Sequence, residues 1–297
     1  MILTYFPLVC VVQSALSAAI VPLEWSTEGL ARIPIQIGLD GGFEFHYVIL
    51  DTRPNPDSPM LWLFRPNVTS TELVTALVTI GANVSPWRED IFVLPMGAID
   101  EVPSSWLRLR IGPTSDFAYA VYGYIITPNQ MIINQRMRDH LELCNHPHRP
   151  IMFPGLVDGG HWGFYIQNNE YVIDSTEAYI VLSEDEFERF WGDVSNALND
   201  HNISLPTMGR VQNCDRDLRQ QLDEILPTFS YMINDRPELE IFISPSDYLL
   251  QESDTCIIAV LSGGSRVLGS PLFRSHSVFF ETDTVRIGIC EYSNYSL

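Results

Sequence analysis

Short apolar or alternating segments recur along most of the chain, separated by turns rich in glycine and proline. Residues 35–38 and 43–50 flank a turn at residues 40–42, which predicts a β-hairpin. Residues 106–111 alternate apolar side chains with two arginines, the pattern of a half-buried strand. Further strands are predicted at residues 119–127, 227–233, 240–243, 256–261, 277–280 and 286–290. Because the chain also contains 20 prolines, the pattern predicts a mainly β protein.

Helix signals are few. The strongest covers residues 184–198, where Ser183 can cap the N-terminus and Glu186 lies three residues further on, as in a capping box. A shorter helix is predicted at residues 215–225 and ends before Pro227. Four apolar side chains share one face of the first helix: Phe187, Phe190, Trp191 and Val194.

Charge narrows the function classes. The 297 residues allow one large or two ordinary domains, and the formal net charge is −20. Such a surface repels phosphate backbones and anionic membranes, which argues against nucleic acid and membrane partners. Self-repulsion falls as the pH approaches the sequence pI of 4.5, which fits an acidic working compartment.

The first 19 residues are predicted to be a signal peptide. Residues 1–12 are almost wholly apolar, and small residues at 14–19 favour cleavage after Ala19. The alternative is an uncleaved anchor, because no basic residues precede the apolar stretch; Pro7 and Gln13, however, interrupt it. We therefore expect a secreted chain, or one in an acidic endomembrane compartment, with no membrane contact after cleavage.

In a secreted chain, the cysteines can form disulfides and the glycosylation sequons can carry glycans. Four cysteines remain after cleavage and allow three disulfide pairings: Cys144, Cys214, Cys256 and Cys290. Four sequons predict a glycoprotein, at Asn67, Asn83, Asn202 and Asn294. Cys144, His146 and His148 also allow a metal site, but no second pair of ligands completes one, so we predict a surface loop and no metal.

One pattern occurs twice. Residues 47–52 (YVILDT) and 171–175 (YVIDS) are apolar runs that end in an aspartate followed by a hydroxyl residue. Two opposed carboxylates can share one proton, so that one of Asp51 and Asp174 could take a proton from a water while the other donates a hydrogen bond to the carbonyl of the scissile amide. Thr52 and Ser175 are then the supporting hydroxyls that fix the geometry of the carboxylates.

At these residues the chain resembles the pepsin-like aspartic peptidases. The resemblance covers residues 35–63, with the segments IQIG, DT and LWL, and residues 162–288. The second region contains LPTF at 226–229, SPSDYLLQ at 244–251 and VLGSPLFR at 267–274, in the order of the family. The resemblance implies a mainly β, bilobal acid protease fold, extended peptide or protein substrates, a monomer and no cofactor. It also implies a disulfide between Cys214 and Cys256.

The chain departs from the family at several places. The family glycine after each Asp-Thr or Asp-Ser is replaced by Arg53 and by Thr176. Glycine lets the backbone turn tightly there, and a β-branched threonine resists a positive φ, so we expect strain at these turns. The two aspartates are only 174 − 51 = 123 positions apart, so the first lobe is expected to be shortened and to lack the strand that braces the first catalytic turn. In the family, a β-hairpin that carries Tyr-Gly, called the flap, closes over the substrate. The best local match here places Ile111 where that tyrosine belongs, and Tyr122 is the second flap candidate.

The expected division is a signal peptide at 1–19, an N-terminal lobe at 20–150 with Asp51, and a C-terminal lobe at 151–297 with Asp174. Two functions follow from the resemblance. The first is an aspartic endopeptidase whose activity is weak or lost, and the second is a non-catalytic homologue that binds peptides or proteins. A carbohydrate-binding or structural β-sandwich is a third alternative and rests on the strand content alone.

Overall fold

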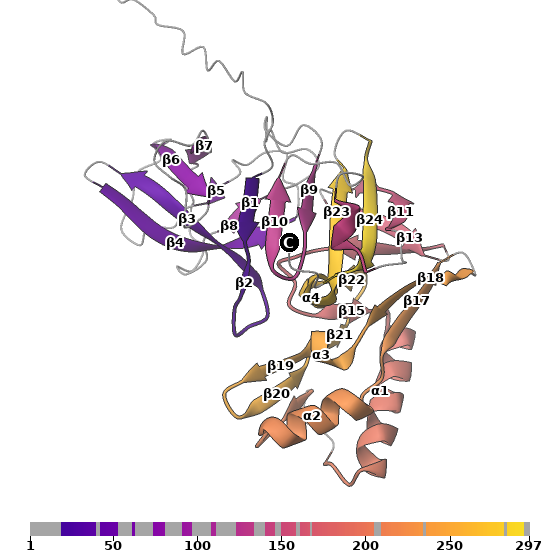
Figure 1. The fold of residues 1–297 in the computed structure, drawn as a ribbon. Helices are drawn as coiled ribbons and strands as arrows, with labels where there is room; N and C mark the ends of the chain where they lie inside the picture. Colours follow the sequence, from indigo (N-terminus) through magenta and orange to yellow (C-terminus); the bar gives the residue numbers. More distant parts are fainter. Residues whose placement is uncertain are drawn as a thin grey trace, which may run out of the picture.

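The computed structural model describes residues 19–39, 42–52, 61–62, 74–80, 91–96, 108–110, 123–133, 140–145, 150–158, 161–166, 168–204, 209–233, 236–281 and 284–293. These residues form three large sheets, with the two longest helices together at one end (Figure 1). Residues 1–18 of the predicted signal peptide, Arg53, Ile111, Tyr122 and the sequons at Asn67, Asn83 and Asn294 lie outside the described residues.

A seven-stranded sheet forms the first half of the fold. Its order is β2-β3-β4-β8-β5-β7-β6, and an additional pairing of β3 with β6 closes the sheet on itself. The hairpin predicted at residues 35–50 is confirmed, since β3 and β4 pair antiparallel with Leu39 opposite Gly42. The strands are β2 (Glu24–Trp25), β3 (Ala31–Leu39), β4 (Gly42–Asp51), β5 (Leu61–Trp62), β6 (Val74–Ile80), β7 (Ile91–Met96) and β8 (Arg108–Arg110).

A six-stranded sheet in the centre takes strands from both sides of residue 150. Its order is β1-β10-β9-β23-β24-β11. Val278, Ile287 and Ile289 are among its completely buried side chains, so this sheet carries much of the shared core. The strands are β1 (Ala19–Pro22), β9 (Tyr124–Ile126), β10 (Gln130–Ile133), β11 (Ile151–Pro154), β23 (His276–Glu281) and β24 (Arg286–Glu291).

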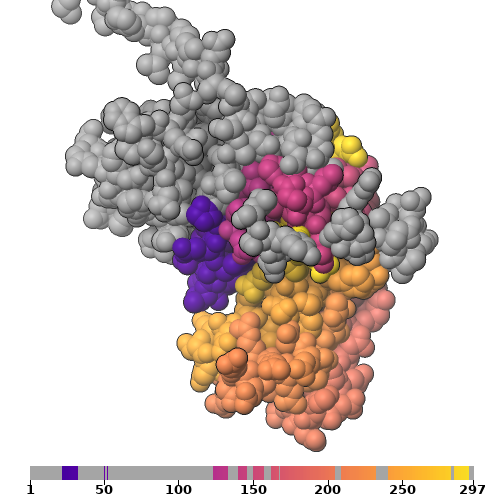
Figure 2. Space-filling model, in the orientation of Figure 1, coloured from indigo at the N-terminus to yellow at the C-terminus, as the bar shows by residue number. Residues whose placement is uncertain are grey.

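The second half contains a six-stranded sheet, β12-β13-β14-β22-β15-β21, together with a three-stranded sheet, β16-β20-β19, and the hairpin β17-β18. In Figure 2 most of residues 184–231 and residues 249–258 form one continuous body that is coloured from salmon to orange. The strands are β12 (Leu156–Asp158), β13 (His161–Ile166), β14 (Asn169–Ile173), β15 (Ile180–Leu182), β16 (Arg210–Val211), β17 (Phe229–Ile233), β18 (Arg236–Ile243), β19 (Leu249–Glu252), β20 (Thr255–Ile258), β21 (Val260–Ser262) and β22 (Arg266–Leu268).

The two predicted helices are confirmed. Helix α1 (Glu184–Asp200) begins with the expected capping box, in which Glu186 accepts a hydrogen bond of 3.1 Å from the backbone N–H of Ser183. Helix α2 (Arg216–Ile225) begins after Asp215, whose side chain accepts from the N–H of Leu218. Helices α3 (Pro245–Tyr248) and α4 (Ser270–Ser275) and the 3₁₀ turn η2 (Leu141–Leu143) complete the described helices. No helix in the described ranges is both long and apolar enough to cross a membrane.

One disulfide lies within the second half of the sequence, and the other joins residue 144 to β24. Cys214 is joined to Cys256, as expected, with their Cα atoms 5.5 Å apart. Cys144 is joined to Cys290, also with a Cα separation of 5.5 Å, which settles the pairing that the sequence left open. Because Cys144 is in a disulfide, it is not a metal ligand. Among the described residues no cluster of three or more His, Cys, Asp or Glu side chains could hold a metal ion.

Candidate active site

The two halves repeat one pattern of strand pairing. In the first, β4 pairs parallel with β8, β8 antiparallel with β5, and β5 parallel with β7. In the second, β14 pairs parallel with β22, β22 antiparallel with β15, and β15 parallel with β21. The strands β4 and β14 end at or just before the two aspartates of the sequence repeat. The repeat is therefore a repeat of structure as well as of sequence.

This pattern corrects one expectation. We expected the first half to lack a strand beside its aspartate turn, but β8 occupies that place, with Leu109 opposite Leu50 and Arg110 opposite Asp51. In the second half, Leu268 of β22 lies opposite Ile173, the residue before Asp174. Both turns thus have a parallel neighbouring strand.

The hydroxyl residues after the two aspartates, Thr52 and Ser175, are hydrogen-bonded to each other. The backbone N–H of Thr52 donates to Oγ of Ser175 over 3.0 Å, and the N–H of Ser175 donates to Oγ1 of Thr52 over 3.0 Å. Oγ of Ser175 also donates to the backbone carbonyl of Leu50 over 2.6 Å. Both hydroxyl residues are completely buried. These bonds fix the backbones that directly follow Asp51 and Asp174 relative to each other, across 123 positions of sequence.

Oδ1 of Asp174 is held within its own turn. This oxygen accepts one bond from the N–H of Thr176 over 2.9 Å and another from Oγ1 of Thr176 over 2.6 Å. Thr176 is not among the described residues with a positive φ. The expectation that a threonine here would strain the backbone is therefore wrong. What Thr176 changes is the hydrogen bonding of the carboxylate.

Residues beyond β22 support the second turn. Oγ of Ser270 donates to the carbonyl of Ser175 over 3.0 Å, and the N–H of Ser270 donates to the carbonyl of Glu177 over 2.7 Å. At Gly269, a Cβ atom would overlap the carbonyl oxygens of Glu177 and Tyr179, so this position requires glycine. The sequence analysis included the VLGSPLFR segment but not the contact of its serine, because only the folded chain brings Ser270 to the turn.

Replacing Ser175 by alanine should destabilise the fold. The change leaves the N–H of Thr52 and the carbonyl of Leu50 buried without this partner, so we expect the free energy of unfolding to fall by about 2 kcal/mol. The matched control is Thr52→Ser, which keeps the hydroxyl and should lose less. Urea unfolding of both variants measures the difference. An equal loss in the two would mean that the Ser175 hydroxyl is not what ties the turns.

Comparison with solved structures identifies the fold. An aspartic proteinase from Irpex lacteus has a TM-score of 0.60 at 9% identity, with 93% of this chain and 98% of that chain covered. The basic 7S globulin of soybean gives a TM-score of 0.60 at 11% identity, over 94% and 98%. Conglutin gamma of lupine seeds gives 0.58 at 12%, over 94% and 95%. The chain has the pepsin-like aspartic proteinase fold.

No family model and no curated protein matches the sequence. At these identities the likeness establishes the fold alone. Within the pepsin-like fold, the described structure brings together Thr52, Ser175 and the ends of the strands that carry Asp51 and Asp174.

Proposed function

We propose that this chain is a secreted aspartic peptidase homologue that cleaves extended peptides slowly, with Asp51 and Asp174 as the catalytic pair. The observation that carries the proposal is the reciprocal hydrogen bonding of Thr52 and Ser175. Two aspartates can act on one water only when their turns are held in register, and this network is a rigid means of doing so. The solved structures of similar fold include one titled an aspartic proteinase and two seed globulins, so the fold by itself leaves the activity open.

The proposed chemistry needs no cofactor. Two carboxylates that face the same water share one proton, because both cannot be ionised cheaply at close range. The ionised carboxylate accepts a proton from the water, and the protonated one donates a hydrogen bond to the carbonyl oxygen of the scissile amide. The water oxygen then bonds to the carbonyl carbon as the protonated carboxyl group passes its proton to the carbonyl oxygen. The C–N bond breaks, the amine takes up the proton that was accepted from the water, and the new carboxylic acid returns a proton to the second carboxylate.

The second candidate is a non-catalytic homologue that binds peptides or proteins in the same cleft. The contact of the Thr176 hydroxyl with Oδ1 of Asp174 favours it, because this oxygen then has a hydrogen-bond donor that a glycine would not supply. The replacement of the first glycine by Arg53 acts in the same direction, since a cation beside the pair would favour the doubly ionised state.

The variant Thr176→Gly should raise kcat/KM for peptide hydrolysis about tenfold. The change removes a hydroxyl that donates to the Asp174 carboxylate, and hydrogen bonds to charged groups are worth about 1.5–3 kcal/mol. Thr176→Val is the matched control, because it keeps the bulk and removes only the hydroxyl. A gain in both variants would attribute the low activity to the hydroxyl. No gain in either would show that this contact does not limit the rate.

Secretion is tested by the mature N-terminus. We expect secreted material to begin at Ile20 and to carry a glycan on Asn67 or Asn202. Residue 20 lies in β1, which pairs with β10 at the edge of the central sheet, so the mature chain would begin inside that strand. N-terminal sequencing and glycopeptide mapping of material from a secreting host measure both. An intact Met1 would refute the signal peptide.

A further inference from the structure

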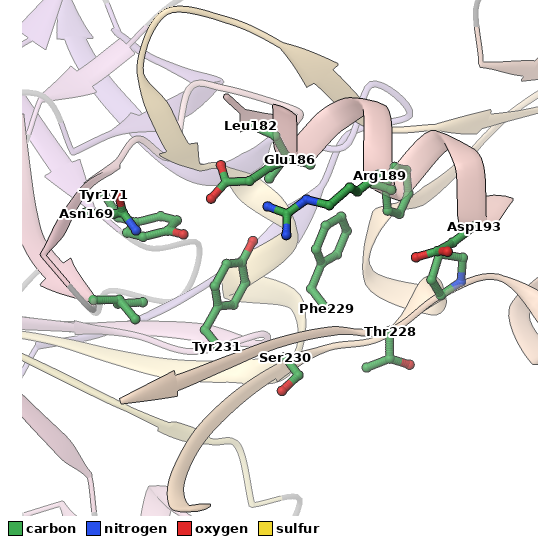
Figure 3. Close-up of a pocket in the computed structure, with 13 residues that line it drawn as sticks. Asn169, Tyr171, Leu182, Glu186, Arg189, Asp193, Thr228, Phe229, Ser230 and Tyr231 are labelled. Carbon is green, nitrogen blue, oxygen red and sulfur yellow. The ribbon is translucent and has the colours of Figure 1, made fainter. Parts of the chain in front are cut away.

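A pocket of about 510 Å³ lies in the second half of the fold, away from the aspartate turns. It opens between the first turns of α1, strand β14 and the first residues of β17 (Figure 3). Asp174, Ser175 and Thr176 do not line it. Its volume suits a ligand of one or two sugar rings. The proposed peptidase function makes no use of this pocket.

One wall of the pocket is aromatic. The rings of Phe190 and Phe229 stack with centroids 4.8 Å apart, and Phe229 lies nearly parallel to Tyr231 at 6.1 Å. Tyr171 meets Tyr231 edge to face at 5.4 Å. All four side chains line the pocket. Phe190, Tyr171 and Tyr231 are buried, while Phe229 is partly exposed and can offer an apolar surface to the C–H face of a sugar ring.

A donor without an acceptor lies in this wall. The hydroxyl oxygen of Tyr231 is buried and has no hydrogen-bond partner among the described residues, while its side chain is only 8% exposed. Burial, with Tyr171 and Glu186 nearby, raises the pKa of Tyr231 well above its usual value, so the hydroxyl stays protonated. In Figure 3 it points toward the side of the pocket that carries Glu186 and Arg189. Buried hydroxyls are rarely left unbonded, so this group indicates an occupant that can accept its hydrogen bond.

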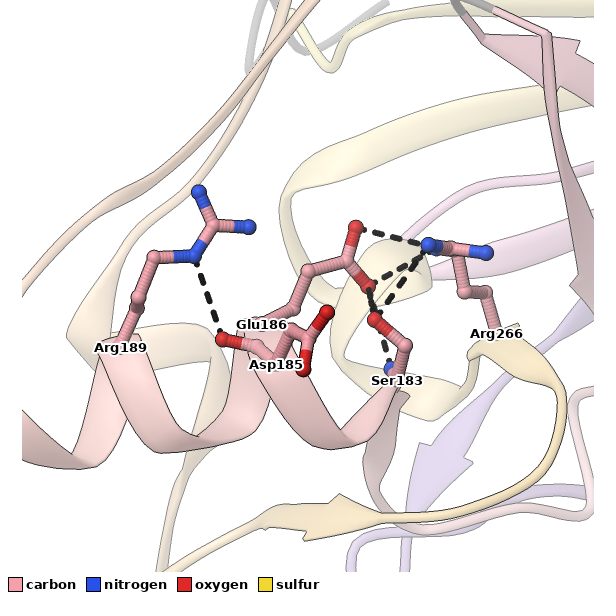
Figure 4. Close-up of polar contacts among 5 residues, drawn as sticks. All are labelled: Ser183, Asp185, Glu186, Arg189 and Arg266. Carbon is pink, nitrogen blue, oxygen red and sulfur yellow. Dashed lines mark hydrogen bonds and ion pairs between the residues drawn. The ribbon is translucent and has the colours of Figure 1, made fainter.

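The charged groups on α1 restrict the kind of occupant. Glu186 is already neutralised by Arg266, whose Nε lies 2.8 Å and 3.0 Å from its two carboxylate oxygens (Figure 4). Nε of Arg189 donates a hydrogen bond to the carbonyl of Asp185 over 3.2 Å. Among the described residues, no hydrogen bond or ion pair of its terminal nitrogens is found. Asp193 follows one turn later on the same helix and also lines the pocket.

We propose that this pocket binds a neutral sugar. An anionic ligand would meet Asp193 beside Arg189, and a cation would meet the arginine. A neutral polyol can bind beside both the carboxylate of Asp193 and the guanidinium of Arg189. Each sugar hydroxyl can donate a hydrogen bond to a carboxylate and accept one from a guanidinium or from Tyr231. The remaining polar lining is of the same two-way kind, from Asn169, Thr228 and Ser230. The net charge of −20 further disfavours an anionic ligand.

The test uses the full mature chain and a panel of neutral disaccharides, namely cellobiose, maltose, lactose, xylobiose and mannobiose. Saturation-transfer NMR should detect at least one of them, with contacts concentrated on the ring C–H groups. Arg189→Gln and Asp193→Asn should each weaken that sugar about tenfold, as expected for a lost hydrogen bond to a charged group. Both side chains are exposed, so neither change should affect folding. The matched control is Glu188→Gln on the same helix, exposed and outside the pocket, which should bind as the unaltered chain does.

Tyr231→Phe separates a ligand contact from a structural role. Without sugar, its melting temperature should equal or exceed that of the unaltered chain, because an unbonded buried hydroxyl is removed. Its affinity for the sugar should fall about fivefold. The proposal is overturned if no disaccharide in the panel binds, or if the aromatic anion 3-phenylpropionate binds in their place. It is also overturned if Arg189→Gln, Asp193→Asn and Tyr231→Phe all bind sugar with unchanged affinity. Peptide hydrolysis should be the same with and without sugar, so failure here leaves the proposed peptidase function standing.

Discussion

Replacing Cys144 and Cys290 by serine is expected to lower the free energy of unfolding by about 5 kcal/mol. The disulfide joins positions 146 residues apart, and on the chain-entropy account a closed loop of that length removes about this much freedom from the unfolded chain. It connects the residue after η2 to β24, so it encloses nearly all of the second half. A loss of this size is comparable with the whole stability of many domains.

The second disulfide is the internal comparison. Cys214 and Cys256 are 42 residues apart, for which the same account gives about 4 kcal/mol. Urea unfolding of both double-serine variants, without reductant, measures the two losses. A Cys144→Ser, Cys290→Ser variant that unfolds at the midpoint of the unaltered chain would contradict the pairing and its contribution.

Acid should destabilise the protein through His276. This side chain is only 4% exposed, and burial lowers its pKa from 6.5 to about 4, although a hydrogen bond to the backbone of Leu272 raises it in part. The unfolded chain therefore takes up a proton at a pH where the folded chain does not. The stabilisation is complete above about pH 6.5 and is lost as the pH falls toward 4, amounting to about 3 kcal/mol.

Asp247 titrates with the opposite sign in the same cluster. Burial raises its pKa, against hydrogen bonds from Ser244 and Ser275 and the charge of Arg274, so protonating it in acid favours the folded state. Oγ of Ser275 lies 2.9 Å from Oδ2 of Asp247 and 2.9 Å from Nδ1 of His276. The effect of His276 must therefore be isolated by difference.

The variant His276→Asn provides that difference. Asparagine keeps a polar group near the position of Nδ1 but does not titrate, so the variant should be less stable at pH 7 and lose about 3 kcal/mol less between pH 6.5 and 4. Urea unfolding at several pH values in that window measures both chains. If the two lose stability in parallel, His276 is not the acid-sensitive group. The result matters for function, because a peptidase that works in acid must hold its fold there.

Features that depend on neighbouring residues could be predicted from the sequence. Ser183 and Glu186 define the start of α1 because a capping box is complete within four residues. The strand at 108–110 follows from alternation, and the β3–β4 hairpin from its turn. The hydroxyls of Thr52 and Ser175 could be named because each follows an aspartate in a repeated segment.

Features that depend on contacts between distant residues could not be predicted from the sequence. The alternation at 108–110 does not say that β8 pairs with β4, and the segment that follows was interpreted as a flap. Replacing the glycine by Thr176 indicated strain, but the fold leaves its φ in the ordinary range and gives its hydroxyl to Asp174. The pocket at Tyr231 combines α1, β14 and β17, which are brought together only by folding.

The central claim is that Asp51 and Asp174 act together on one water. The most direct measurement is digestion of a peptide library from pH 3 to 7 by three proteins: the unaltered chain, Asp174→Asn, and the double variant Arg53→Gly, Thr176→Gly. We expect slow cleavage by the unaltered chain on the acidic side of the range, faster cleavage by the double glycine variant, and none by Asp174→Asn. Cleavage that persists in Asp174→Asn, or none by either the unaltered chain or the glycine variant, would contradict the claim.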